Sequence, residues 1–275
     1  MKVGTKTIMV KASLNDLKFA PVSESRILDY VELLNLSLPK TTFTVEYLKW
    51  LYFDNPNGVA FGRDALEGDK LVAHYVCIPI KISGLKKKSL LSLNTATHPN
   101  FRGMGLFPIL AEETFGMARG KFSSVVGVAN ARSVKVFTEK LGFELLGNLD
   151  LRFGRLSRPK IGSRIYDARE LAWRSQSPGR DLSINVSSRG YTLATTKPYR
   201  FVPKLWALVH QGNSSTMQFN KLLLGLTLDW RKGKNPKLKL PDCLKPSPLH
   251  LIYRSLEDSI GESLTSWSFP DFDAF

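Results

Sequence analysis

Eleven residues decide the fold of this chain: Thr97-His98-Pro99-Asn100-Phe101-Arg102-Gly103-Met104-Gly105-Leu106-Phe107. Residues 89–97 are typical of a strand, and an apolar stripe with a helical period begins at Leu106. Glycine allows positive φ and a close approach to a ligand, so Gly103 and Gly105 predict a tight turn between the two elements. The first amides of a helix have no partner within it, which suits a diphosphate. A plain glycine turn between strand and helix is the alternative interpretation.

The residues around this turn predict a mixture of α and β structure. Helical spacing indicates helices near 28–38 and 43–51. Strands are expected at 59–62, 71–80, 89–97 and 123–128. Asn130 is a good N-cap for a further helix with Phe137 on its inner face, and residues 143–153 alternate loosely as a strand.

Two motifs about thirty residues apart resemble the two halves of the acetyl-CoA site in the GNAT N-acetyltransferase superfamily. The first is Pro99-x-x-Arg102-Gly103-x-Gly105-Leu106, and the second is Asn130-x-x-Ser133-x-x-Val136-Phe137-x-x-x-Leu141-Gly142-Phe143. The resemblance covers residues 20–155 in topology, is specific in 90–145, and is closest to bacterial GNAT-like acyltransferases. Phe107 departs from the Gly or Ala that is common there. The resemblance implies an α+β or α/β fold with a mixed central sheet flanked by helices.

The resemblance also implies how acetyl-CoA is held. The backbone amides that open the helix would bind the diphosphate: Arg102, Gly103, Met104, Gly105, Leu106 and Phe107. The strand end Thr95-Ala96-Thr97 would offer backbone groups to the pantetheine arm, Asn130 would contact the arm or cap its helix, and Ser133 could face the cofactor. Phe137, also in this cofactor region, stands where the superfamily often has the tyrosine that protonates the leaving thiolate, and a role in the helix core is its better interpretation.

The implied chemistry is direct attack of a primary amine on the acetyl thioester, for which a general base would remove a proton. The sequence does not determine this base, and the weak candidates are His98, Asn94, Ser92 and His74. A buried structural histidine is the alternative for His74, and an exposed turn residue for His98. Ser92 and Asn94 are expected on one face of their strand, where they could line an acceptor pocket.

The second half of the chain predicts a further, smaller GNAT-like domain without the glycine turn. We expect residues 1–157 to form the acetyl-CoA-binding domain and 164–275 a degenerate second domain that shapes the acceptor side. Its expected elements are strands at 183–186, 191–194 and 205–210, a helix with Leu222–Leu224, Leu226 and Leu228 on its core face, and closing strands at 249–254 and 267–275. Glu46–Trp50 also resembles Glu170–Trp173, which is weak evidence for a repeat.

The charge favours an anionic partner. Of the total net charge of +15, residues 1–150 carry 19 basic and 14 acidic side chains, or +5, which leaves +10 for residues 151–275. A small anionic amine acceptor is therefore expected, and the resemblance to family members of polysaccharide clusters implies an amino-sugar nucleotide as an example. A non-catalytic acyl-CoA-binding module is the alternative, and a nucleic-acid-binding protein ranks last because no such motif is present.

The rest of the composition bounds the class of protein. A hydrophobic fraction of 43 % in 275 residues is sufficient for a buried core. Two cysteines, Cys77 and Cys243, exclude a disulfide framework and lack metal-site spacing, so no metal is expected. No apolar run is long enough to span a bilayer, and a cytoplasmic location is expected. The acyl length and the oligomeric state stay open.

Overall fold

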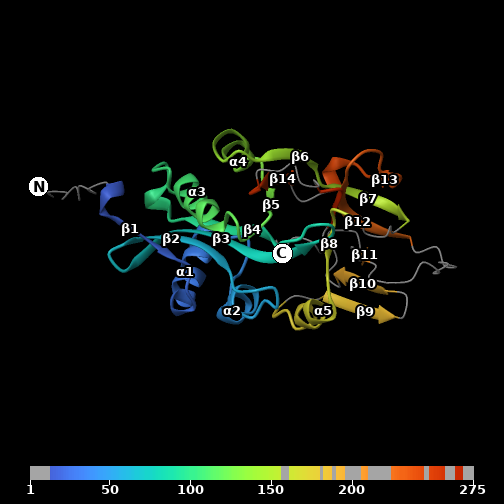
Figure 1. Cartoon of the computed structure of the whole chain (residues 1–275), viewed down its shortest axis with the longest axis horizontal. Helices are drawn as coiled ribbons and strands as arrows, with labels where there is room; N and C mark the ends of the chain where they lie inside the picture. The colour runs from blue at the N-terminus through green and yellow to red at the C-terminus, as the bar shows by residue number, and fades with distance from the viewer. Residues whose placement is uncertain are drawn as a thin grey trace, which may run out of the picture.

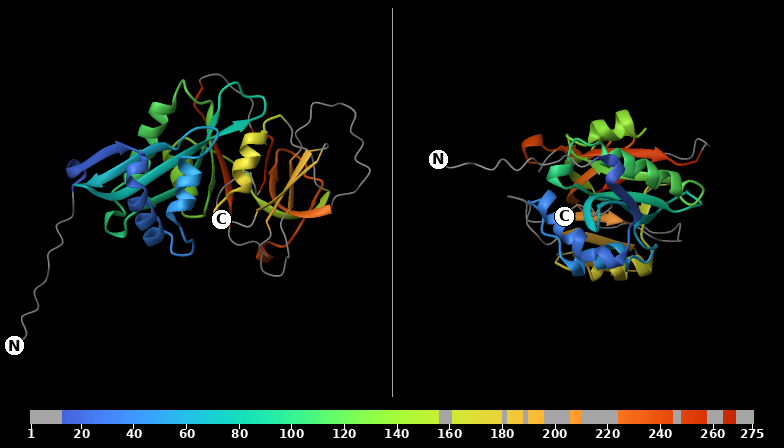
Figure 2. Two further views of the ribbon diagram at one scale, coloured as in Figure 1. Left: turned by 90° about the horizontal axis from the view of Figure 1, so that it is seen from below. Right: turned by 90° about the vertical axis from the view of Figure 1, so that its left-hand side faces the viewer.

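The computed structural model describes residues 13–155, 161–179, 182–187, 190–195, 206–209, 224–244, 248–257 and 264–268. The first strands of the N-terminal sheet lie at one end of the long axis, and two smaller sheets lie at the other (Figures 1 and 2). Short 3-10 helices precede or join the main elements at Leu14–Asp16, Glu24–Arg26, Pro99–Phe101 and Asp242–Leu244. No helix in the described ranges is both long and apolar enough to cross a membrane.

The N-terminal sheet is mixed. Its strands lie in the order β1 (Leu17–Pro21), β2 (Phe61–Glu67), β3 (Lys70–Ile82), β4 (Ser89–Thr97), β5 (Ser124–Ala129), β14 (His250–Ser255) and β6 (Glu144–Asn148), and β8 (Arg164–Ile165) pairs with the end of β3. Along this order β4 and β5 run parallel, whereas the other neighbouring pairs are antiparallel. The glycine turn and its helix connect these two parallel strands.

Helices cover both faces of this sheet (Figure 1). One face carries α1 (Ile27–Ser37) and α2 (Val45–Tyr52), and the other carries α3 (Leu106–Ala118) and α4 (Val134–Lys140). Successive side chains of β3 point to opposite faces of the sheet and so contribute to both hydrophobic cores. Val76 and Ile78 belong to the core under α1 and α2, whereas Tyr75 and Cys77 belong to the core under α3. The predicted mixed sheet flanked by helices is confirmed.

The observed boundaries of an element agree closely with the predicted ones where turn residues flank that element in the sequence. The predicted strand at 89–97 and the helix from Leu106 are confirmed. The prediction of a strand at 59–62 was too early, since β2 runs from Phe61 to Glu67. The single strand expected at 143–153 is two strands, because the chain leaves the N-terminal sheet at Leu149 and continues as β7 (Asp150–Arg155) in another sheet.

Two smaller sheets and one helix form the C-terminal half. One sheet has the order β13 (Leu238–Lys239), β7, β12 (Leu224–Arg231) and β15 (Ser266–Ser268), and the other has the order β11 (Trp206–Val209), β10 (Gly190–Thr195) and β9 (Leu182–Ser187). The helix expected around Leu222–Leu228 was wrong from Leu224 onward, because Leu224, Leu226 and Leu228 alternate along the strand β12. Leu222, Leu223 and residues 269–275 lie outside the described residues.

The two halves exchange strands. In the N-terminal sheet β14 lies between β5 and β6, and in the C-terminal sheet β7 lies between β12 and β13. The expectation that residues 249–254 close the second unit was therefore wrong, since this strand completes the first sheet. A division at 157–164 stays a prediction for folding units, but the strand pairing does not follow it.

A pair of tryptophans joins α2 to α5 (Ala168–Ser175). The Trp50 and Trp173 rings stack with centroids 4.2 Å apart, and each indole Nε1–H donates to the backbone carbonyl oxygen of the other residue, at 2.9 and 3.0 Å. These two residues end the similar segments 46–50 and 170–173. The two similar segments therefore contact each other, and the repeat that the sequence indicates weakly stays a prediction.

Candidate functional site

The parallel strands β4 and β5 part at the end nearest α3. They pair only at Leu90–Val125, Leu91–Val126 and Ser92–Gly127. Beyond this point β4 continues to Thr97, paired with β3 alone, and β5 continues to Ala129, paired with β14 alone. The edge of β4 from residue 93 to 97 that faces away from β3 is therefore open for backbone hydrogen bonds, as expected for Thr95–Thr97.

The turn before α3 presents unpaired amides at this opening. Gly103 and Gly105 both have positive φ, 84° and 76°, and an added Cβ would meet no atom within 4 Å at either residue. Among the described residues, no acceptor takes a hydrogen bond from the amides of Gly103, Gly105, Leu106 or Phe107. Free donors at the start of a 13-residue helix form a cradle for an anion.

Side chains at the edge of this cradle are already engaged. Arg102 Nε donates to the Thr97 carbonyl oxygen at 3.3 Å, and Ser37 Oγ donates to the same oxygen at 3.3 Å. The Thr97 carbonyl therefore has two partners, whereas the Arg102 guanidinium stays exposed beside the turn. Met104 is half-buried against the core under α3.

Asn130 organises the loop after β5. Its Oδ1 accepts from the Arg132 and Ser133 amides at 2.9 and 3.0 Å, and also contacts Ser133 Oγ at 3.2 Å. Helix α4 begins at Val134, so Asn130 caps the turn before the helix rather than the helix itself. Asn130 Oδ1 and Ser133 Oγ are thus committed to each other, and their contact with a cofactor stays a prediction.

Phe137 is part of an aromatic core. It is 6 % exposed, and its ring packs edge-on against Phe107 and Phe143 with centroids 5.0 Å apart in both pairs. Phe107 also lies 5.8 Å from the Tyr75 ring, so the residue that departs from the common motif fills this core from the first turn of α3. These contacts give Phe137 the structural role that the sequence favours.

The four candidate catalytic side chains do not gather at one point. His98 Nδ1 accepts from the Asn100 amide at 3.3 Å and caps the 3-10 helix of the turn. Ser92 lies on the α3 face, since a Cβ at its partner Gly127 would meet both the Ser92 Cβ and the Ile252 side chain of the core under α3. The expectation that Ser92 and Asn94 share a face was wrong, because a β-bulge places Asn94 and Thr95 opposite the single residue Tyr75. Asn94 has φ 46° and its side chain reaches Tyr52 of α2.

Asn94 ends a buried chain of polar side chains on the α1 and α2 face. Asp64 Oδ1 lies 2.7 Å from His74 Nδ1, His74 Nε2 lies 3.3 Å from the Tyr52 hydroxyl, and Asn94 Nδ2 donates to that hydroxyl at 3.1 Å. The side chains of Asp64 and His74 are fully buried. His74 is therefore the buried, hydrogen-bonded histidine that the alternative interpretation described, yet it connects to the opening between β4 and β5.

Sequence analysis missed four members of this network: Arg26, Tyr30, Tyr52 and Asp64. The Tyr30 hydroxyl donates to Asp64 Oδ2 at 2.7 Å and its ring stacks on His74, and Arg26 Nε donates to the same oxygen at 3.0 Å. Burial is the main cause that raises the pKa of Tyr52 well above its ordinary value of 10, so this hydroxyl keeps its proton at neutral pH. Asp64 has no comparable signal in the sequence, because β2 also carries Arg63 and Glu67 and only the structure shows that the Asp64 side chain is fully buried.

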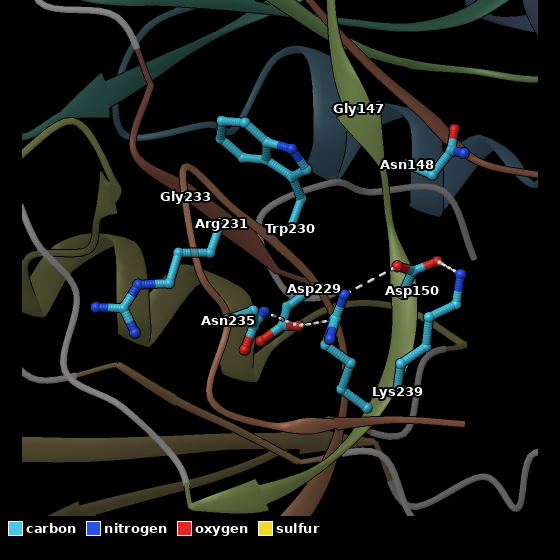
Figure 3. A pocket seen from close by; sticks show the side chains of 10 residues that line it. Gly147, Asn148, Asp150, Asp229, Trp230, Arg231, Gly233, Asn235 and Lys239 are labelled. Atoms are coloured by element: carbon cyan, nitrogen blue, oxygen red, sulfur yellow. Dashed lines mark hydrogen bonds and ion pairs between the residues drawn. The ribbon is translucent and has the colours of Figure 1, made fainter.

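An open pocket of about 370 Å³ lies in the C-terminal half (Figure 3). It is lined by Gly147, Asn148, Asp150, Arg152, Asp229, Trp230, Arg231, Gly233, Asn235 and Lys239. Asp150 pairs with Arg152 and Lys239 at 3.1 Å each, and Asp229 pairs with Lys237. Arg231 points away from the other charged groups in Figure 3. Most charges of this pocket are thus neutralised within it.

Comparisons with known proteins support the fold. Neither a family model nor a curated protein matches the sequence. Among solved structures, the chain is similar to a probable N-acyltransferase from Enterococcus faecalis, with 10 % identity, a TM-score of 0.55, and coverage of 87 % of this chain and 73 % of that one. It is equally similar to a GCN5-related N-acetyltransferase from Anabaena variabilis, with 13 % identity, a TM-score of 0.55, and coverage of 88 % and 73 %. The chain therefore has the GNAT fold.

Proposed function

We propose that this chain is an N-acyltransferase that transfers an acetyl group from acetyl-CoA to a primary amine. The observation that carries the proposal is the set of unpaired amides at the glycine turn, directly beside the point where β4 and β5 part. The turn supplies donors for a diphosphate, and the open edge of β4 supplies backbone groups for an amide-containing arm. The GNAT fold of the solved neighbours agrees with this reading.

The residues present fit acetyl-CoA. Open space above Gly103 and Gly105 leaves room for a phosphate against the backbone, which a side chain at either position would occupy. The free amides of residues 103–107 would bind the diphosphate; the expectation for the Arg102 amide was wrong, because it donates to the Pro99 carbonyl oxygen at 3.3 Å and caps the 3-10 helix before the turn. Thr95–Thr97 would hold the pantetheine arm and aim a backbone amide at the thioester carbonyl oxygen. The bound thioester supplies an activated acetyl group, which the amine attacks directly. Phe137 has no proton to give, so a different donor or the solvent would protonate the thiolate.

The acceptor in this proposal is small and anionic, such as an amino-sugar nucleotide. The supporting observation is the net charge of +10 in residues 151–275. The pairs Asp150–Lys239 and Asp229–Lys237 show that this excess is not concentrated in the open pocket, so it would act by steering the acceptor rather than by one cradle.

Calorimetry followed by a turnover screen tests the proposal. We expect micromolar binding of acetyl-CoA, and release of CoA in the presence of amino-sugar nucleotides. Polyamines and peptides complete the amine panel, and turnover with polycations alone would contradict an anionic acceptor. Binding without turnover of any amine would indicate the non-catalytic acyl-CoA module that Phe137 also permits. Binding of duplex DNA with a steep salt dependence and no binding of acetyl-CoA would refute the proposal.

A further inference from the structure

The polar chain from Asp64 to Asn94 has one consistent order of hydrogens. Asn94 Nδ2 donates to the Tyr52 oxygen, so the Tyr52 hydrogen is free to go to His74 Nε2. A neutral imidazole that accepts at Nε2 carries its hydrogen on Nδ1, and this nitrogen faces Asp64 Oδ1 at 2.7 Å. The carboxylate of Asp64 is the final acceptor of the chain.

Asp64 is held as an acceptor by groups outside this chain. Its second oxygen accepts from Tyr30 of α1 and from Arg26, whose side chain is 21 % exposed. The buried carboxylate therefore has a cation and two further donors, which is the partner set that an ionised carboxylate needs in a core. With Asp64 as the acceptor at one end, a neutral imidazole at His74 fixes the direction of the whole chain.

The direction of the hydrogen bonds in this chain determines which end of the Asn94 side-chain amide faces Tyr52. Its NH2 group faces Tyr52, so its Oδ1 faces away from the buried network. This oxygen accepts no hydrogen bond from a described residue, and Asn94 is only partly buried. Asn94 also has left-handed backbone geometry, with φ 46°, at the bulge of β4. A free acceptor is thus presented by a residue with unusual backbone geometry.

The bulge places this acceptor at the opening. Pairing of β4 with β5 ends at Ser92, two residues before Asn94. Helix α3 and its free amides lie on one face of the sheet, whereas Asn94 contacts Tyr52 of α2 on the other. A CoA thioester bound at the α3 amides would pass between β4 and β5 and bring its carbonyl to the α1 and α2 face, where Asn94 lies.

We propose that Asn94 Oδ1 accepts a hydrogen bond from the nitrogen of the acceptor amine and so selects an N–H group next to the acyl carbonyl. Tyr52, His74 and Asp64 are positioning residues that keep the amide of Asn94 turned in this direction. Asn94 takes no proton from the amine. The inference rests on the proposed function, because it needs a CoA thioester between β4 and β5.

Two unreactive CoA thioethers test this assignment without knowledge of the acceptor. In one the sulfur carries CH2–CO–NH2, and in the other it carries CH2–CO–CH3. They differ only by an N–H donor on the far side of the carbonyl. We expect the full-length protein to bind the amide about tenfold more tightly, which corresponds to one hydrogen bond. The preference should fall to about one in Asn94→Ala and in Tyr52→Phe.

Tyr253→Phe is the matched control. Tyr253 is 7 % exposed and lies on β14, so its replacement also removes one hydroxyl from the core. This variant should keep the tenfold preference. Because the readout is a ratio of two affinities in one protein sample, partial loss of folded protein affects both compounds equally.

Each further outcome has one meaning. Equal binding of both compounds by the unaltered protein, or a preference that survives in Asn94→Ala, would overturn the contact of Asn94 with the amine. A preference that is lost in Asn94→Ala and kept in Tyr52→Phe would overturn the positioning role of the chain. Failure of both compounds to bind the unaltered protein would instead refute the proposed function.

Discussion

In the N-terminal and the C-terminal sheet alike, the strand contributed by the other half of the chain is the second strand from one edge. The two sheets differ in the strands that lie beside it. β14 lies between β5 and β6 in the first sheet, and β7 lies between β12 and β13 in the second. Only the first combines this arrangement with a parallel neighbour, β4, that parts from β5 and leads into a glycine turn and a long helix. The described strand pairs of the second half are all antiparallel.

This difference means that the exchanged strands contribute to the stability of both sheets, whereas the free amides and the polar chain belong to the N-terminal half alone. The exchanged strands make each sheet depend on the other half of the chain, because β5 and β6 would both lose a neighbour without β14. The free amides and the polar chain, in contrast, come entirely from residues 26–107. The C-terminal half therefore supports the first sheet whether or not it contacts a substrate.

The largest expected effect comes from cutting the chain between the halves. A fragment of residues 1–157 keeps all the proposed acetyl-CoA residues but lacks β14, whose Leu251 and Ile252 are fully buried. We expect this fragment to show no cooperative urea unfolding and no acetyl-CoA binding, because the edges of β5 and β6 are left unpaired. Circular dichroism during urea titration and calorimetry are the measurements.

A shortened chain sharpens this test. Asn148 and His250 are direct partners in the β6–β14 ladder, so an Asn-Gly turn in place of residues 149–249 would connect the two strands as a hairpin. This chain should be more stable than the 1–157 fragment, because it restores β14 as the neighbour of both β5 and β6 although it lacks residues 149–249. A 1–157 fragment that unfolds as cooperatively as the full chain would show that the exchange is dispensable.

The second effect concerns the turn that only the first half has. Gly105→Glu places a carboxylate where the diphosphate is expected, and we predict that acetyl-CoA binding weakens at least ~100-fold by calorimetry. A side chain at φ 76° also costs on the order of 1 kcal/mol of stability. The loss of binding should therefore accompany only a modest shift in the melting temperature.

Two other glycines provide controls with the same strain and charge. Gly68 in the β2–β3 turn and Gly233 after β12 have φ of 58° and 79°, and an added Cβ meets no atom within 4 Å at either residue. Gly68→Glu and Gly233→Glu should bind acetyl-CoA as tightly as the unaltered chain. Equal loss of affinity in all three variants would mean that the effect of Gly105→Glu is not local to the site.

The sequence predicts best where local chemistry decides the structure. The strand 89–97 and the helix from Leu106 are marked by glycines, a proline in the first turn and a helical period, all within one short segment. No local feature of the sequence indicates that β14 pairs with β5 and β6. Alternation of apolar and polar residues indicates that a segment is a strand, but it does not indicate which sheet the strand joins. The three consecutive leucines at 222–224 led to the prediction of a helix, although Leu224, Leu226 and Leu228 alternate as expected for the strand β12.

The candidate site shows the same limit. The turn amides could be identified because helix starts leave donors free, but the polar chain depends on a bulge that turns Asn94 away from the face of Ser92. Asp64, His74 and Tyr52 come from β2, β3 and α2, and only tertiary packing brings them together. His74 could be named as a candidate from its apolar strand, whereas Tyr30 and Tyr52 had no distinguishing signal.

The smallest expected effect concerns an ion pair that joins the two halves. Lys81 at the end of β3 lies 2.5 Å from Asp167, which also caps α5 by accepting from the Glu170 amide. The hydrogen bond from Lys81 is the first cause that lowers the pKa of Asp167 below its ordinary value of 3.8. Both side chains are more than one third exposed, so Asp167→Asn, which keeps the cap, should lower the free energy of unfolding by about 0.5 kcal/mol at pH 7.

The pH dependence of this loss identifies its origin. A carboxyl group with a lowered folded-state pKa stabilises the protein above its unfolded pKa, and this contribution disappears as the pH falls through the folded value. The difference between the unaltered chain and Asp167→Asn should therefore be constant from pH 5 to 7, begin to shrink as the pH falls below about 3.8, and vanish only below the lower folded-state pKa. Asp167→Ala should lose about 1 kcal/mol more at every pH above that range, because it also removes the cap. A difference between Asp and Asn that does not shrink at all as the pH falls from about 5 to about 2 would assign the effect to packing of α5 rather than to the ion pair with β3.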